Sequence, residues 1–396
     1  MNAHLTSVIE NVKKKHSNEP EFVQTVEEVF SSLEPVIEQH PEYEAADLLS
    51  RMVEPERTFS FRVTWMADDG TWHTNTGYRT QFNGAIGPYK GGLRFRKDVN
   101  LGIIKFLAFE QTFKNALTGL PIGSGKGGSD FDPTGKSDAE IMRFCQAYMQ
   151  ALYRYIGPDV DVPAGDMGVG GREIGYLFGE YRRLKGAWEN GVLTGKGFAS
   201  GGSRIRPEAT GFGAVYYLEN VLKHEGEEIA GKTIACAGFG NVTWGICRKA
   251  TELGAKVVTL SGPDGYIYDP DGVTTEEKIA YLVEMRSSGR NRVQDYAEKF
   301  GVEFFPGEKP WGVKADVVMP SAMQNDVHME QAKQIAANGV KYYIEVANMP
   351  TTNEALSYLM SQPGVIVAPS KAVNAGGVAT SALEMAQNSE RLVWTE

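Results

Sequence analysis

The chain has 396 residues, of which 42% are hydrophobic and 23% charged, which is enough for roughly two or three domains with sizeable cores. This composition excludes a small disulfide-stapled protein and a disordered polypeptide. The 40 lysines and arginines stand against 50 aspartates and glutamates, for a formal net charge of −10. That balance argues against nucleic acid as the principal partner.

Cysteines, histidines and apolar runs narrow the class of protein further. The three cysteines cannot pair off evenly and show no C-x-x-C spacing, which is typical of a reducing compartment, so we expect a cytoplasmic protein. The six histidines are scattered, with no H-E-x-x-H pattern, and no metal site is expected. Because neither a secretion signal nor a run of about 18 apolar residues occurs, no membrane partner is expected either.

The N-terminal half mixes helical and strand patterns. Apolar residues recur at helical spacing over residues 20–38, which predicts an amphipathic helix. Residues 57–82 alternate apolar and polar side chains around an Asp-Gly turn, which predicts a hairpin. The stretches 101–118 and 138–156 are predicted helices, separated by a loop rich in Gly and Asp over residues 119–138.

Glycines cluster between residues 186 and 213 and place a domain boundary near residue 200. Beyond this point short apolar strands alternate with helical patterns, which indicates a parallel sheet with crossover helices. The expected fold is therefore α/β with two domains: an N-terminal α/β substrate and assembly domain, and a Rossmann-like, doubly wound dinucleotide-binding domain.

A glycine-rich turn follows the first strand of the second domain. The strand Lys232–Ala237 runs into Gly238-Phe239-Gly240-Asn241-Val242-Thr243, after which a helical pattern continues to Gly254. Gly238 permits a tight turn, and Gly240 lets the backbone approach a pyrophosphate at the helix N-terminus. Thr243 stands where the third glycine of the motif is expected, and the alternative is a merely structural turn.

The end of the second strand is where a ribose-binding residue is expected. The strand Lys256–Leu260 leads into Ser261-Gly262-Pro263-Asp264-Gly265, and Asp264 lies 26 residues beyond Gly238. An acid there favours the 2′-hydroxyl of NAD, and no Lys or Arg occurs between residues 257 and 277 to bind a 2′-phosphate. The sequence therefore favours NAD over NADP, with Gly262 and Asp264 as candidate contacts. The alternative is that Asp264-Gly265 is only a turn.

Three lysines form a candidate anion site. Lys90 and Lys126 are flanked by glycines, and Lys114 shares a predicted helix face with Gln111. The surroundings of Lys126 do not match a phosphate-binding P-loop. If the ammonium groups converge, the pKa of the most buried lysine falls and that lysine can act as a base, with Asp166 as a proton relay. For Lys114 the alternative is a helix ion pair with Glu110.

Six ungapped strings together carry a resemblance to a known family. They are GYRTQFNGAIGPYKGGLRF (77–95), FEQTFKNALTGLPIGSGKGGSDFDP (109–133), DVPAGDMGVG (161–170), RPEATGFG (206–213), AGFGNVTWG (237–245) and SKAVNAGGVATSALEM (370–385). The chain resembles hexameric glutamate dehydrogenases of the bacterial NAD-specific kind, within the family of Glu, Leu, Phe and Val dehydrogenases. The resemblance covers nearly the whole chain.

The resemblance implies a role for each matching residue. The catalytic residues it implies are Lys126 and Asp166. Lys90 and Ser381 would bind the side-chain carboxylate of the substrate, Gln111 and Lys114 its α-carboxylate end, and Gly165 would also contact it. On the cofactor side, Thr210 would lie beside the nicotinamide and Asn241 near the phosphates, with Gly238, Gly240 and Val242 in the same turn.

The implied reaction is the reversible oxidative deamination of L-glutamate to 2-oxoglutarate and ammonia, with NAD accepting the hydride. Lys126 would assist water attack on the iminium, and Asp166 would handle the protons. The expected domains are residues 1–200, completed by 371–396, for substrate binding and assembly, and residues 201–370 for NAD, hinged near 200 and 370. A homohexamer is implied by the resemblance alone.

Two alternatives remain open. A branched-chain or aromatic amino-acid dehydrogenase is similar around the lysine loop but has an apolar side-chain pocket, against which Lys90 and Ser381 argue. Members of the family usually continue through a further helical stretch, whereas this sequence stops at Glu396. An inactive, truncated scaffold of the same fold is therefore the second alternative.

Overall fold

The computed structural model describes residues 2–395 and divides the chain into two compact units. The first unit comprises Met1–Arg204 and Ser381–Glu396, and the second comprises Ile205–Thr380. The second crossing was expected near residue 371, but it falls inside the helix Gly376–Glu390, labelled α15.

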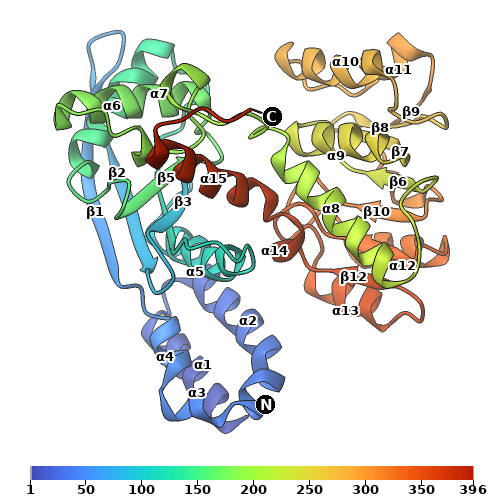
Figure 1. The fold of residues 1–396 in the computed structure, drawn as a ribbon, viewed down its shortest axis with the longest axis horizontal. Helices are drawn as coiled ribbons and strands as arrows, with labels where there is room; N and C mark the ends of the chain where they lie inside the picture. The colour runs from blue at the N-terminus through green and yellow to red at the C-terminus, as the bar shows by residue number, and fades with distance from the viewer. Residues whose placement is uncertain (1, 396) are drawn as a thin grey trace. The chain divides into compact units, whose positions relative to one another are not determined.

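The first unit contains a run of four helices followed by a mixed α/β arrangement (Figure 1). Its elements before the crossing are α1 (Ala3–Lys15), α2 (Pro20–Gln39), α3 (Pro41–Ala45), α4 (Leu48–Met52), β1 (Arg57–Met66), β2 (Trp72–Asn83), β3 (Tyr89–Phe95), α5 (Leu101–Ala116), β4 (Ser124–Ser129), α6 (Asp138–Leu152), β5 (Asp161–Gly165), α7 (Gly171–Lys185) and the 3-10 turns η1 (Asn190–Val192) and η2 (Phe198–Ser200). The predicted helices α2, α5 and α6 and the hairpin of β1 and β2 are confirmed.

The sheet of the first unit has the strand order β1-β2-β4-β3-β5. β1, β2 and β4 pair antiparallel, whereas β3 pairs parallel with both β4 and β5. The prediction of a loop throughout residues 119–138 was wrong, because Ser124–Ser129 forms the inner strand β4. Its sequence, Ser-Gly-Lys-Gly-Gly-Ser, has no β-branched or aromatic residue, so only its pairing with β2 and β3 makes it a strand.

Two apolar cores stabilise the first unit. One joins Trp65 of β1 and Phe95 of β3 to α6 and α7. The other joins α1, α2 and α5 around Phe82 of β2. The sheet is therefore held on both sides, which fixes the ends of β3, β4 and β5 in place.

The second unit is a doubly wound α/β domain. Its elements are α8 (Ala209–His224), β6 (Thr233–Cys236), α9 (Asn241–Glu252), β7 (Lys256–Gly262), β8 (Gly265–Tyr268), α10 (Glu276–Ser287), α11 (Gln294–Phe300), β9 (Glu303–Pro306), the 3-10 turn η3 (Pro310–Gly312), β10 (Val317–Met319), α12 (Met329–Ala337), β11 (Tyr342–Ile344), α13 (Asn353–Ser361), β12 (Ile366–Ala368), α14 (Ser370–Val373) and the start of α15. Ile234 and Cys236 of β6 belong to one core, and Ala235 and Ala237 to another, so apolar layers cover both faces of the sheet.

The strand order of the second unit is β12-β11-β10-β6-β7-β8-β9. The predicted parallel sheet is confirmed for β6, β7, β10, β11 and β12, but β8 pairs antiparallel with both of its neighbours, β7 and β9. The reason is the tight turn between Gly262 and Gly265, which can only fold β8 back on β7. No helix within residues 2–395 combines the length and the apolar character needed to cross a bilayer.

The chain order reverses between β6 and β10, because β7 lies on one side of β6 while β10, β11 and β12 lie on the other. In open α/β sheets ligands bind at this switch point, beyond the carboxyl ends of the strands. The loops after β6, β7 and β10 are therefore the part of the second unit in which to look for a ligand site.

Candidate active site

A lysine, an aspartate and an arginine meet at the end of β5 in the first unit. Lys126 Nζ on β4 lies 3.0 Å from Asp166 Oδ2, and Arg94 Nε on β3 donates a hydrogen bond to the same oxygen at 3.0 Å. Lys126 is buried, and the side chains of Arg94 and Asp166 are 15% and 22% exposed. The sequence prediction had paired Lys126 with Asp166, and the structure brings these two together. It had not used Arg94.

Burial and neighbouring charges shift the pKa of both partners. Burial lowers the pKa of Lys126; Asp166 opposes this shift, while the charges of Arg94 and Arg79 add to it. Burial raises the pKa of Asp166, but the charges of Lys126 and Arg94 outweigh that effect and hold its pKa well below the usual range. Such a site combines an ammonium group whose proton is held less tightly than usual with a carboxylate that is ionised before the reaction begins.

Two glycines of β3 explain how these side chains come so close. A Cβ at Gly92 would lie 2.9 Å from Asp166 Cβ and 2.7 Å from the oxygen of Gly165, and a Cβ at Gly91 would lie 1.7 Å from the oxygen of Gly125. Real Cβ atoms do not approach that closely. The glycines after Lys90 are therefore needed so that β4 and the end of β5 can pack against β3.

Lys90 is buried, with 1% of its surface exposed. Its ammonium group forms hydrogen bonds with residues of two later segments of the same chain. Lys90 Nζ donates to the backbone oxygen of Val162 at 3.0 Å and to Thr194 Oγ1 at 2.8 Å. Burial of a lysine is costly unless its charge is compensated by hydrogen bonds or an anion. This arrangement suits a carboxylate ligand. Thr194 was missed by the sequence analysis, because it lies 104 positions from Lys90.

The helix α5 lies against β3 and β4 through polar side chains. Asn115 Nδ2 donates to the oxygens of Lys90 and Gly123 at 3.2 and 2.6 Å, and Gln111 Nε2 donates to Asn115 Oδ1 at 2.6 Å. Gln111 thereby lies beside Gly91, next to Lys90. Lys114 is half-buried on the same helix. The structure thus brings Gln111 to the lysine site through Asn115.

The last two predicted substrate contacts differ in what surrounds them. Gly165 is the final residue of β5, directly before Asp166, and pairs with Leu93. Ser381 is buried in α15 and is the first residue of that helix to belong to the first unit.

A second buried ion pair, which sequence reasoning missed, supports these strands. Arg79 of β2 forms a two-point ion pair with Asp161 at the start of β5, with its Nε at 2.9 Å from Oδ2, and donates to the oxygen of Gly91 at 3.0 Å. Gln81 Nε2 also donates to Asp161 Oδ2 at 3.0 Å. The network connects β2, β3 and β5, and no local pattern in the sequence signals it.

In the second unit a cavity of about 460 Å³ lies at the switch point. Its lining comes from the turn between β6 and α9 with the start of α9, the end of β7 and the residue after it, and the loop after β10, with three residues from elsewhere. These residues are Gly238, Phe239, Gly240, Asn241, Val242, Ser261, Gly262, Pro263, Ser321, Ala322, Met323, Arg286, Asn291 and Lys309. The cavity therefore contains five of the predicted cofactor residues: Gly238, Gly240, Asn241, Val242 and Gly262.

The glycine-rich turn has the geometry expected for a pyrophosphate. Gly238 has a φ of +80°, which only glycine adopts easily. Gly240 precedes α9, and a Cβ placed there would meet nothing within 4 Å, so its surface is open. No side chain caps the N-terminus of α9, which leaves its first backbone N–H groups for an anion. These residues fit a dinucleotide.

Thr243 at the third position of the glycine motif has a hydrogen-bonding role. Its Oγ1 donates to the oxygen of Ala237 at 3.0 Å and lies 3.1 Å from Ser321 Oγ. Ser321 Oγ also donates to the oxygen of Ala237 at 2.6 Å. The threonine therefore links the end of β6 to the loop after β10, and its departure from the glycine motif leaves the turn intact.

Two predicted cofactor residues lie outside this cavity. The carboxylate of Asp264 accepts hydrogen bonds from the backbone N–H groups of Val293 and Gln294 at 2.9 and 3.0 Å. Asp264 therefore caps α11. Each of its oxygens accepts one backbone hydrogen bond and keeps a further acceptor site, so the assignment of Asp264 to the ribose stays a prediction. Thr210 lies in the first turn of α8, near Gly377, and does not line the cavity.

Two basic side chains line the cavity, which the sequence did not predict. No Lys or Arg occurs between residues 257 and 277, yet Arg286 and Lys309 reach the cavity from later segments. Lys309 Nζ is paired with Asp326 at 3.0 Å, which compensates part of its charge. Within residues 2–395, no group of three or more His, Cys, Asp or Glu side chains is arranged to hold a metal ion.

Comparisons with known proteins agree with this architecture. Residues 201–396 match the family Glutamate/Leucine/Phenylalanine/Valine dehydrogenase, and residues 55–183 match its dimerisation domain. The chain is 69% identical over 395 residues to an NAD-specific glutamate dehydrogenase of Clostridium symbiosum, covering 100% of this chain and 88% of that protein. An NADP-specific glutamate dehydrogenase of Haemophilus influenzae is 53% identical over 393 residues, covering 99% and 87% of the two chains.

Among solved structures, one of a glutamate dehydrogenase superposes with a TM-score of 0.98 at 69% identity, covering 100% of this chain and 88% of that one. The similarity therefore extends through both units.

Proposed function

This chain belongs to the Glutamate/Leucine/Phenylalanine/Valine dehydrogenase family, and we propose that it catalyses the reversible, NAD-dependent oxidative deamination of L-glutamate to 2-oxoglutarate and ammonium. One observation carries the choice of glutamate: the buried ammonium group of Lys90 lies on the strand next to the Lys126–Asp166 pair. A substrate side-chain carboxylate offers this ammonium group a charged acceptor, which a branched-chain or aromatic side chain does not.

The charges of the first unit suit a substrate with two carboxylates. Lys90, held by Thr194, is assigned to the side-chain carboxylate together with Ser381. Gln111 and Lys114 on α5 are assigned to the α-carboxylate, and the backbone of Gly165 to a further contact beside Asp166. Hydrogen bonds to charged groups at both ends of a short molecule fix its length and its orientation.

The chemical step needs a base and a proton carrier beside the α-carbon. NAD supplies the hydride acceptor when it is bound. Lys126, whose pKa is lowered by burial, takes a proton from the water that attacks the iminium carbon. Asp166, 3.0 Å from Lys126, carries protons to and from the amino group as the carbinolamine loses ammonia. Arg94 keeps the Asp166 carboxylate oriented between these transfers.

For the cofactor, Gly238, Gly240, Asn241 and Val242 are assigned to the pyrophosphate at the N-terminus of α9, and Gly262 to the adenosine side. Thr210 is assigned to the nicotinamide end. NAD is favoured over NADP because relatives of 69%, 57% and 56% identity are named NAD-specific, whereas one of 55% identity is named NAD(P)-specific. Asp264 stays assigned to the ribose 2′-hydroxyl on its spacing from Gly238.

A homohexamer in the cytoplasm completes the proposal. The match of residues 55–183 to a dimerisation domain supports self-association. Cys145, Cys236 and Cys247 are buried and free, as expected in a reducing compartment. Sedimentation velocity on the purified chain tests the assembly: a single hexameric species is expected, and a monomer at micromolar concentration would overturn it.

The function is tested by initial rates of NADH formation with L-glutamate, L-leucine and L-phenylalanine. We expect turnover with glutamate alone. Lys126→Met should abolish it, while Lys136→Met, on the exposed loop after β4, should keep the wild-type rate. Faster oxidation of leucine or phenylalanine, or an unaffected Lys126→Met variant, would refute the proposal.

A further inference from the structure

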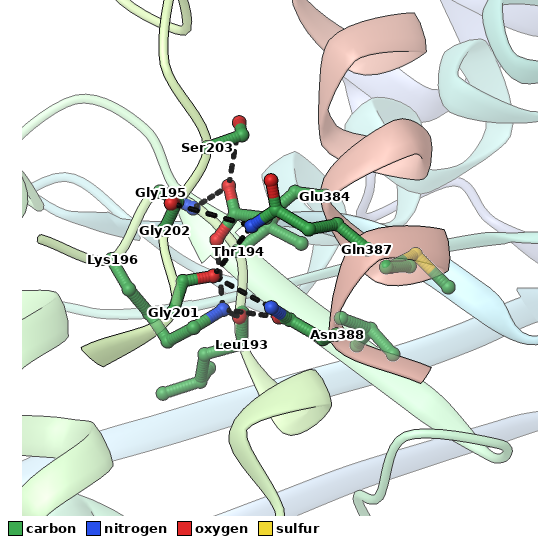
Figure 2. A network of polar contacts seen from close by, with 12 residues as sticks. Leu193, Thr194, Gly195, Lys196, Gly201, Gly202, Ser203, Glu384, Gln387 and Asn388 are labelled. Atoms are coloured by element: carbon green, nitrogen blue, oxygen red, sulfur yellow. Dashed lines mark hydrogen bonds and ion pairs between the residues drawn. The ribbon is translucent and has the colours of Figure 1, made fainter. Parts of the chain in front are cut away.

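A buried ion pair outside the reacting groups joins α15 to the segment Leu193–Ser203 (Figure 2). Lys196 Nζ lies 2.7 Å from Glu384 Oε1, and the two side chains are 1% and 0% exposed. The ammonium group also donates to Asn388 Oδ1 at 2.8 Å and to the backbone oxygen of Leu193. Its three hydrogens thus have three acceptors, as a buried lysine requires.

Other side chains of α15 hold the same segment at further points. The second oxygen of Glu384, Oε2, accepts a hydrogen bond from the backbone N–H of Gly195 at 3.0 Å. Asn388 Nδ2 and Gln387 Nε2 both donate to the oxygen of Gly201, at 2.6 and 3.3 Å. As Figure 2 shows, these side chains project from one helix toward the segment.

Thr194, the residue that contacts Lys90, is the second residue of the segment Leu193–Ser203. Thr194 lies between Leu193 and Gly195, the two residues whose backbone is bonded by Lys196 and Glu384, and its hydroxyl accepts from Lys90 Nζ at 2.8 Å. Ser381 lies one helical turn before Glu384 in α15, so the two share a face of that helix. The ion pair therefore connects the element that carries Ser381 to the neighbours of Thr194.

We propose that Lys196 and Glu384 are positioning residues that set the distance between Ser381 and the Lys90–Thr194 pair, and with it the chain length of the dicarboxylate that the enzyme accepts. The proposal rests on the proposed function and deepens it. Neither residue is assigned to the substrate. A buried, fully hydrogen-bonded charge pair has a narrow range of geometries, so it holds the two elements in one register.

The main test is the double variant Lys196→Met with Glu384→Gln, which leaves no charge buried without a partner. For 2-oxoglutarate we expect KM to rise about tenfold while kcat stays within about threefold, because the reacting groups are untouched. The KM for NADH should not change. The preference for 2-oxoglutarate over 2-oxoadipate, which is one methylene longer, should fall about tenfold.

The control variant is Asp269→Asn, which neutralises an equally buried carboxylate. Asp269 lies in the second unit, where its carboxylate forms an ion pair with Lys278 at 2.6 Å and accepts a hydrogen bond from the hydroxyl of Tyr296. It should lower the thermal midpoint and leave both the KM for 2-oxoglutarate and the preference over 2-oxoadipate as in the wild type. This separates a positioning effect from a general loss of stability.

A folded double variant with an unchanged KM and an unchanged preference would overturn the proposal. So would a loss of preference of equal size in Asp269→Asn. If the double variant does not fold, the variant Asn388→Ala is used instead, because it removes one hydrogen bond of Lys196 and keeps the ion pair with Glu384. Its KM for 2-oxoglutarate should rise, and its preference over 2-oxoadipate should fall, about threefold. If neither quantity changes, the proposal is overturned. Failure of the proposed function is distinct, because the wild type itself would then not turn over 2-oxoglutarate.

Discussion

Replacing Arg94 by methionine should move the pH dependence of glutamate oxidation to higher pH. Lys126 acts as a base only when neutral, so the rate rises as the pH passes through its pKa, which burial places below the usual value for lysine. Arg94 adds a nearby positive charge that lowers this pKa further. Removing that charge favours the protonated lysine, and the pKa of Lys126 must therefore rise.

The size of the shift follows from the geometry. Arg94 Nε and Lys126 Nζ both lie 3.0 Å from Asp166 Oδ2, so they are no further apart than twice that distance. At an effective dielectric constant of about 20, two unit charges ~6 Å apart repel by about 3 kcal/mol. Because the Asp166 side chain is 22% exposed, solvent screening reduces this, and we expect a shift of about one pH unit, or ~1.4 kcal/mol.

The assay is the profile of kcat/KM for L-glutamate against pH, for the wild type, Arg94→Met and the control Arg96→Met. Arg96 is two residues further on, 48% exposed and paired with Asp98, so its variant should follow the wild-type profile. The pKa of Asp166 should rise as well, since it loses one of its two cations. An active Arg94→Met enzyme whose ascending limb, the pH range in which the rate rises, is unmoved or moved to lower pH would refute this account of Lys126.

Three further substitutions test the remaining structural assignments. Gly240→Ala should raise the Kd for NAD at least about tenfold in titration calorimetry, because the added Cβ enters the proposed phosphate site. The thermal midpoint should change little, because that Cβ meets no protein atom within 4 Å. An unchanged Kd would contradict the assignment of this turn to the pyrophosphate. Asp264→Ala should cost about 1–2 kcal/mol in urea unfolding through loss of the α11 cap. Its assignment to the ribose predicts that the Kd for NAD rises as well, and an unchanged Kd would contradict that assignment. Asp161→Asn should cost about 3–5 kcal/mol because the buried guanidinium of Arg79 loses its partner, and a stable variant would disprove the role of that pair.

Much of the fold could be predicted from the sequence because local periodicity reports burial. Helix α2 and the hairpin of β1 and β2 followed from periods of 3.6 and 2, and the switch from β6 to α9 followed from the glycine-rich turn. Strand β4 was missed because its six residues carry no strand preference, and only their partners on either side impose the conformation.

The site was predicted in part for a similar reason. Lys90, Lys126 and Asp166 stand in glycine-rich strings whose composition marks them, and the structure places Lys126 against Asp166. Arg94 was not singled out because nothing local distinguishes it from its exposed neighbour Arg96.

The cap that Asp264 provides for α11 could not be predicted from the sequence. Asp264 stands at the expected spacing from Gly238, but its partners are backbone groups 29 and 30 residues away. Spacing along the chain identifies the right loop, whereas only the tertiary fold decides which side chain in that loop faces the ligand.

The central claim is that this chain interconverts glutamate and 2-oxoglutarate with NAD. Its most direct test is the fall in NADH absorbance with 2-oxoglutarate and ammonium, run beside NADPH and beside the branched-chain acid 4-methyl-2-oxopentanoate. The account predicts rapid consumption of NADH with 2-oxoglutarate, at least about tenfold slower reaction with NADPH, and none with the branched-chain acid. Preferential reduction of the branched-chain acid, or no reaction from folded protein that binds NADH, would contradict it.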